Sequence, residues 1–352
     1  MTRTTLRTVV GDVDVSGMGS TLTHEHLFIS GDSHWEQTGS DPDPSPTAEP
    51  AISDLWRWRE NLDGNRSNLR LDDEAVAKHE VSLLRSFGYN TLLDLTTIGL
   101  GRRPDALRRV AEATGLNIVA GTGFYSGATL PDDVATWDED RMVETMVRDI
   151  EVGIDGTDIK AGVIGEVGIS WPIKPVEQRS LAASVEAMRR TGAAMSIHTP
   201  FHKNDVSILE EISDSLRSLG ADMSRVVLGH CDTYTTNPRF FDVASDLGCV
   251  LQIDMFGNSG YESAMDFHYP SDEQRIAAVL RLIEMGLADR LMISQDCGLK
   301  TCLRSYGGHG YDYIPRVIAP RLRREVAQSN SLELVLEKNA QRIFPLATTP
   351  SA

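Results

Sequence analysis

Two histidines separated by one residue, His24 and His26, are the first residues in this chain whose types and spacing suggest chemistry. They lie in the run Thr21–Leu27, whose apolar and β-branched residues predict a strand. In an extended strand the side chains of residues i and i+2 point to the same face, so the two imidazoles can bind one metal ion together. The pair predicts half of a metal site.

The elements that must position this pair repeat along the chain as strand-like runs separated by amphipathic helical patterns. Seven further runs are predicted as strands: Thr91–Leu95, Ile118–Phe124, Ala161–Gly168, Met195–Thr199, Val226–His230, Val250–Met255 and Leu291–Asp296. Helices are predicted between them: Asp73–Phe87, Pro104–Thr114, Asp140–Val152, Pro175–Thr191, Asp205–Leu219, Pro238–Leu247 and Ser271–Met285. This alternation predicts an α/β fold, a single-domain (β/α)8 TIM barrel over residues 1–352. A doubly wound open sheet is the alternative, although no GxGxxG motif follows the first strand.

The segment 30–70 interrupts this alternation directly after the first strand. It holds four prolines, Pro42, Pro44, Pro46 and Pro50, and after them Trp56 and Trp58. We interpret it as a long βα loop inserted at the mouth of the barrel, where active sites lie. Its tryptophans either line a substrate pocket or pack the loop onto the barrel.

Residue types that bind metals recur at the carboxyl ends of the predicted strands. They are His24, His26, Glu166, His198, His230 and Asp296. Because a TIM barrel brings these strand ends together, we expect the six side chains to converge. Four imidazoles and two carboxylates exceed the needs of one tetrahedral zinc ion, but they suit two divalent ions that share a bridging carboxylate and hydroxide.

Composition excludes several other classes of function. The chain has 51 acidic and 34 basic residues and a formal charge of −17, which disfavours nucleic acid and anionic membranes as partners. No signal peptide or membrane-spanning apolar run is present, so we expect a cytoplasmic protein. The four cysteines show no CxxC spacing and are predicted to be reduced thiols.

With these residues in place, the chain resembles the phosphotriesterase family of the amidohydrolase superfamily, and within it the branch of phosphotriesterase-related proteins. The resemblance covers nearly the whole chain. It is carried by Thr23–Leu27, Ile159–Gly168, Ser196–Thr199, Leu228–Asp232, Ile293–Asp296 and Tyr306–Tyr311.

The resemblance implies that a more buried ion is bound by His24, His26 and Asp296. It implies that a second ion is bound by His198 and His230, and that Glu166 bridges the two ions. Many family members bridge with a carboxylated lysine instead. Here Lys160 lies about 20 Å away along an extended strand and belongs to the opposite end of the barrel. The resemblance also implies a homodimer. Zinc is the expected metal, while manganese, cobalt and iron suit the same ligands.

The chemistry predicted for such a centre is hydrolysis by a metal-bridging hydroxide. Asp296 is the expected catalytic residue, which takes the proton of the hydroxide and delivers it to the leaving group. The expected substrate is a small carboxylic amide, ester or lactone, because animal members of the related branch are associated with N-acyl amides. A phosphotriester is the alternative. A metal-binding barrel without catalysis and a mononuclear isomerase or deaminase are the alternatives from other classes.

Two further residues are candidates for substrate binding. Tyr125 matches the tyrosine that lactonases of the family place beside the lactone carbonyl, although Met255 follows Asp254 where those lactonases tend to carry arginine. The other candidate is His309, in the Gly-rich loop after the last predicted strand, which either contacts the ligand or shapes that loop.

Overall fold

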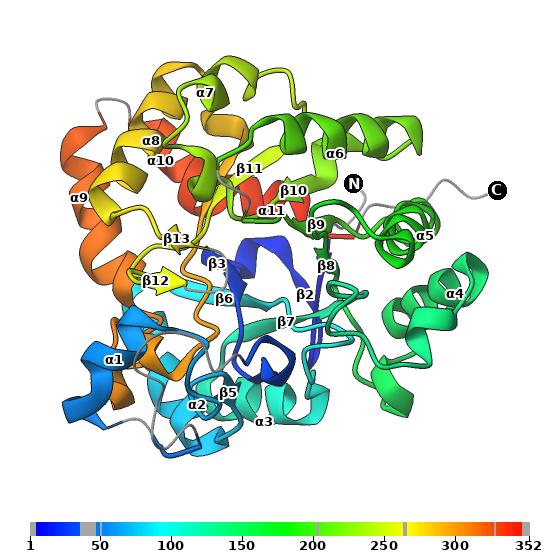
Figure 1. Cartoon of the computed structure of the whole chain (residues 1–352), viewed down its shortest axis with the longest axis horizontal. Helices are drawn as coiled ribbons and strands as arrows, with labels where there is room; N and C mark the ends of the chain where they lie inside the picture. The colour runs from blue at the N-terminus through cyan, green and yellow to red at the C-terminus, as the bar shows by residue number, and fades with distance from the viewer. Residues whose placement is uncertain are drawn as a thin grey trace.

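The predicted (β/α)8 barrel is confirmed by the computed structural model, which describes residues 5–35, 47–49, 51–201, 204–262, 266–326 and 329–346. Eight parallel strands form one sheet in chain order: β3 (Ser20–Glu25), β6 (Tyr89–Asp94), β7 (Asn117–Thr122), β8 (Val163–Gly168), β9 (Met195–His198), β10 (Val226–Leu228), β11 (Val250–Ile253) and β14 (Leu291–Ile293). The Asp296 amide donates to the His24 carbonyl at 3.1 Å, which brings the last strand beside the first. In Figure 1 these strands occupy the centre and helices surround them.

The helices follow the strands as predicted. They are α2 (Glu74–Val81), α3 (Pro104–Thr114), α4 (Glu139–Glu151), α5 (Pro175–Thr191), α6 (Ser207–Ser218), α7 (Arg239–Val243) and α8 (Asp272–Glu284). The last strand is followed by a π-helical turn (Ile314–Ile318), α9 (Ala319–Glu325), α10 (Ser329–Glu333), a second π-helical turn (Leu334–Lys338) and α11 (Asn339–Ile343). The bounds of α3 and α5 match the prediction because each starts with proline and ends before a glycine of positive φ.

Two apolar clusters hold the barrel together. The larger one lies between the strands and the helices. The smaller one contains residues of the strands or directly beside them: Leu93, Leu95, Val119, Val163, Ala194, Val227, Val250 and Met292. It also includes Leu6 from an antiparallel hairpin, β1 (Thr5–Thr8) and β2 (Gly11–Asp14), which contacts the barrel before its first strand begins.

The loop between β3 and α2 is tied to the barrel by a short antiparallel pair, β4 (Ile29–Ser30) and β5 (Arg70–Leu71). It carries α1 (Leu55–Glu60), which contacts the small pair β12 (Tyr261–Glu262) and β13 (Phe267–His268). Trp58 is buried and Trp56 is 53% exposed, and neither is among the described residues that line the cavity reported below. The four prolines of this loop lie outside the described residues.

Among the described residues, no helix combines the length and the apolar character that crossing a membrane requires.

Candidate active site

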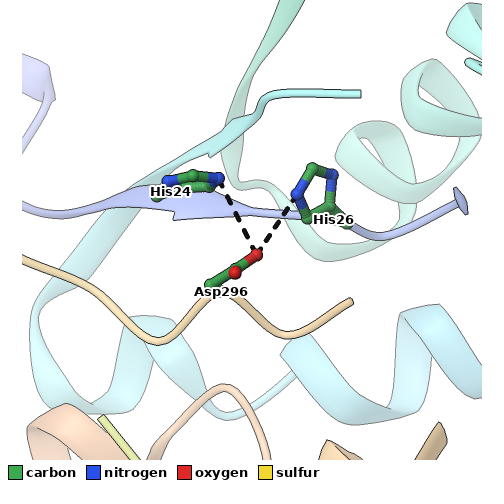
Figure 2. Close-up of side chains that lie close together, drawn as sticks. All are labelled: His24, His26 and Asp296. Atoms are coloured by element: carbon green, nitrogen blue, oxygen red, sulfur yellow. Dashed lines mark ion pairs between the residues drawn. The ribbon is translucent and has the colours of Figure 1, made fainter. Parts of the chain in front are cut away.

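His24, His26 and Asp296 converge at the carboxyl end of the barrel. The Nε2 atoms of the two histidines lie 3.7 and 3.3 Å from the same oxygen of Asp296, Oδ1. Figure 2 shows both imidazoles, which come from β3 and the residue after it, directed toward the Asp296 carboxylate on the segment after β14. One ligand atom from each residue lies within 4.8 Å of the others, so the three side chains can hold one ion.

A second group of three donors lies beside the first and shares Glu166 with it. Glu166 Oε2 is 3.0 Å from His198 Nδ1, which is in turn 2.8 Å from His230 Nε2. The other oxygen of the same carboxylate, Oε1, is 3.3 Å from His26 Nε2. Glu166 therefore faces both groups, as a bridging ligand must. The structure brings together all six residues that the sequence nominated as metal ligands.

The electrostatics of this centre suit cations. The buried Nε2 of His24 has no hydrogen-bond partner in the described chain, although unpaired buried polar atoms are costly. Burial alone lowers the pKa of His24, but the nearby carboxylates of Glu166 and Asp296 outweigh it and raise that pKa well above its usual range. The site thus stabilises positive charge among nitrogen and oxygen donors, which is what two divalent ions supply.

Two of these candidate ligands take an unusual backbone conformation. His230 and Asp296 have φ angles of 56° and 49°, in the left-handed region. For residues other than glycine this region costs about 1 to 3 kcal/mol each, and such residues cluster at functional sites. Because both residues leave the extended conformation, β10 and β14 end two or three residues before the predicted ends.

Asp254, which follows β11, contacts two of the candidate ligands. Its Oδ2 is 2.8 Å from His24 Nδ1, and its Oδ1 is 3.0 Å from His230 Nδ1. Burial raises the pKa of Asp254, but His230 and His24 outweigh it and hold the pKa well below its usual value. An ionised carboxylate on the far nitrogen of an imidazole fixes the ring and increases its basicity toward a metal. This role was not predicted from the sequence, although Asp254 directly follows a strand, as candidate ligands at other strand ends do.

Replacing Asp254 by asparagine should weaken metal binding about 10- to 100-fold, because an amide removes the negative charge that supports both imidazoles. Competition with a chelator would measure this change. The control is Asp289→Asn, which changes an exposed carboxylate beside the start of β14. Unchanged metal affinity in the Asp254 variant would contradict the supporting role.

Comparison with known proteins agrees with this geometry. The sequence profile of the phosphotriesterase family matches residues 4–344. A phosphotriesterase-related protein of Nematostella vectensis is 36% identical over 335 residues, which cover 93% of this chain and 95% of that protein. The N-acetyltaurine hydrolase of Homo sapiens is 33% identical over 347 residues, covering 96% and 97%. This chain belongs to the phosphotriesterase family.

The fold comparison supports the same membership. A resiniferatoxin-binding protein from Rhodobacter sphaeroides superposes with a TM-score of 0.92 at 31% identity, covering 97% of this chain and 94% of that protein. The phosphotriesterase family is a family of binuclear metal enzymes, and the named relatives include hydrolases. The chain is accordingly a hydrolase with ligand clusters suited to metal ions.

A cavity of about 660 Å³ opens onto the candidate metal centre. Its lining includes His26, Glu166, His198 and Asp296. Tyr125 also lines it, and the Tyr125 hydroxyl lies 3.1 Å from His198 Nδ1. A substrate in this cavity would therefore meet the phenol and the candidate metal ligands side by side.

His309 takes the loop-shaping position rather than a place on the cavity wall. It is not among the described residues that line the cavity. Its Nε2 lies 3.6 Å from Cys297 Sγ, and a Cβ added at Gly257 would fall 2.6 Å from its ring. Burial lowers the pKa of His309 to about 4, so the ring is neutral. Its ring contacts Cys297 and Tyr313, which lie on the segments after β14.

The four cysteines form no disulfide, and Lys160 lies apart from the candidate metal centre. All four cysteines are free and buried, as predicted. Lys160 lies with Arg7 and Arg108 around a separate cavity beside the β1–β2 hairpin, away from Glu166. It takes no place in the candidate metal centre.

Proposed function

We propose that this protein hydrolyses a small carboxylic amide with two divalent metal ions. The observation that carries the proposal is that two groups of possible metal ligands lie on either side of Glu166, and that Glu166 lines the cavity. Relatives named N-acetyltaurine hydrolases favour an amide over a phosphotriester as the substrate. This chain is 33% identical to the human one, and the match covers 96% of this chain. Esters and lactones remain within the reach of the same chemistry.

When bound, two divalent cations would supply a water of lowered pKa and polarise the carbonyl that is attacked. The imidazole-rich ligand set favours zinc, and it accepts manganese, cobalt or iron.

Asp296 has the position of a catalytic proton carrier. Its side chain contacts His26 and lines the cavity, so it lies between the ligand cluster and the space for substrate. Burial raises the pKa of Asp296, but His24 and His26 outweigh it and lower the pKa, which keeps the carboxylate ionised and able to accept a proton. We propose that it passes this proton to the leaving amine. The Tyr125 hydroxyl, which lies beside His198 on the cavity wall, would contact the substrate next to the ligand cluster.

A substrate panel tests this function. We expect the metal-loaded protein to hydrolyse N-acyl amino acids or N-acyl amino-sulfonates faster than aryl esters, lactones or a phosphotriester, with kcat/KM as the measured quantity. Turnover of the phosphotriester alone would show that the substrate proposal is wrong. If metal-loaded protein turned over none of these compounds, a barrel that binds ligands without catalysis would become the better description.

A further inference from the structure

One cationic side chain lines the cavity that holds the metal ligands. Lys174 lies just before α5, and it is the sole lysine or arginine among the described residues of the cavity wall. It is exposed, and within the described chain no ion pair involves its ammonium group. In a protein with a formal charge of −17, a lysine on the wall of this cavity favours an anion there.

The position of Lys174 is fixed by a buried carboxylate, Glu177. The Lys174 amide donates to Glu177 Oε2 at 3.0 Å, and the Ser170 hydroxyl donates to the same oxygen at 2.7 Å. Glu177 Oε1 accepts from the Gly127 amide at 2.9 Å. These bonds occupy both oxygens of Glu177, which leaves the Lys174 ammonium available.

The alkyl part of Lys174 also has a defined contact. A Cβ added at Gly127 would lie 3.3 Å from Lys174 Cδ, so the stem packs closely against this glycine. Packing of the stem leaves the ammonium at the end to face polar groups.

The wall of the cavity is otherwise largely apolar. It includes Ile29, Leu62, Leu69, Leu100, Ile169, Trp171, Pro200, Phe201, Met255 and Leu299. The cavity therefore offers candidate metal ligands that would hold the ions polarising the scissile carbonyl, an apolar surface and one lysine. A pocket with few polar groups at defined positions selects ligands that match each of them.

We propose that Lys174 binds an anionic group on the amine part of the substrate, so that the substrate class is short N-acyl amino acids or N-acyl amino-sulfonates. This inference rests on the proposed amide hydrolysis. Carboxylate and sulfonate present the same charge to the ammonium, and the assay separates them by using both.

The test compares two anionic amides, N-acetyltaurine and N-acetyl-β-alanine, with the neutral amide N-acetylethanolamine. Lys174→Met should raise KM for the better anionic substrate about tenfold or more, because a charge-assisted hydrogen bond is lost. We expect kcat for that substrate and both constants for N-acetylethanolamine to change little. Lys174→Arg should restore the low KM, and Lys160→Met, at the separate cavity, is the matched control.

A binding measurement complements the kinetics. In the Asp296→Asn background, titration calorimetry of the better anionic substrate should show a Kd raised about tenfold or more by Lys174→Met. Raising the salt concentration should weaken binding to the protein with Lys174 more than binding to the variant without it.

Two results would overturn the inference while amide hydrolysis stands: equal KM values of the wild-type protein for anionic and neutral amides, or an equal loss on both in Lys174→Met. Failure of the wild-type protein to hydrolyse any amide would instead refute the proposed function, and this inference with it.

Discussion

Asp296→Asn is expected to lower kcat about 10²- to 10⁴-fold, the usual contribution of a positioned proton carrier. The amide keeps the size and one oxygen of the carboxylate that lies 3.3 Å from His26 Nε2. It cannot accept the proton that must reach the leaving group. Steady-state kinetics with the best substrate of the panel, together with metal analysis of the same sample, would measure both effects.

The matched control is Asp158→Asn, whose carboxylate is 86% exposed beside the separate cavity near the β1–β2 hairpin. It should retain wild-type kcat. If Asp296→Asn kept its two ions and an unchanged kcat, Asp296 would be a ligand without a catalytic role.

Glu166→Ala is expected to cost the protein at least one metal ion and, with it, the activity. Both oxygens of Glu166 face donor groups, 3.3 Å from His26 Nε2 and 3.0 Å from His198 Nδ1. Even residues that only support a ligand are worth about 10- to 100-fold in metal affinity, so removal of a shared ligand should exceed about 100-fold. Plasma mass spectrometry after gel filtration would count the ions per chain.

Glu166→Asp is the informative companion to this variant, because it keeps the charge and shortens the side chain. We expect it to retain more metal than Glu166→Ala. Full turnover by Glu166→Ala with one ion per chain would favour the mononuclear isomerase or deaminase alternative.

The barrel and its metal ligands could be predicted because both leave a local signal in the sequence. Each strand is a short apolar run, and each proposed ligand lies at or near the end of such a run, where parallel strands meet. This rule brings Glu166 and His198 together, and the family resemblance supplies the expected role of each ligand. Proline and glycine at its two ends made the bounds of α5 predictable to the residue.

Features that depend on loops could not be predicted in the same way. Trp56 and Trp58 differ in exposure because of the way α1 lies on the barrel, which no local pattern specifies. The roles of Glu177 and Lys174 arise from contacts between the loops after β7 and β8. Asp254 is the exception, since its strand-end position could have identified it.

Arg275 shows another feature that only the three-dimensional structure reveals. Its guanidinium is fully buried, with Nε 2.8 Å from Asp232 Oδ2 and Nη1 2.9 Å from the Asn258 carbonyl. Asp232 follows the ligand His230 by two residues, and Asn258 lines the cavity. The buried cation therefore connects α8 to two segments of the site.

The bonds of Glu177 have a consequence for exchanging loops between relatives. Gly127 and Ser170 belong to different βα loops, yet both donate hydrogen bonds to this one carboxylate. Replacing either loop alone by one with a different backbone conformation would remove that loop's hydrogen bond to Glu177. A buried carboxylate oxygen would then lack a donor, which is costly. The two loops and the first turn of α5 thus form one transplantable module, and substrate preference should be inherited with that module as a whole.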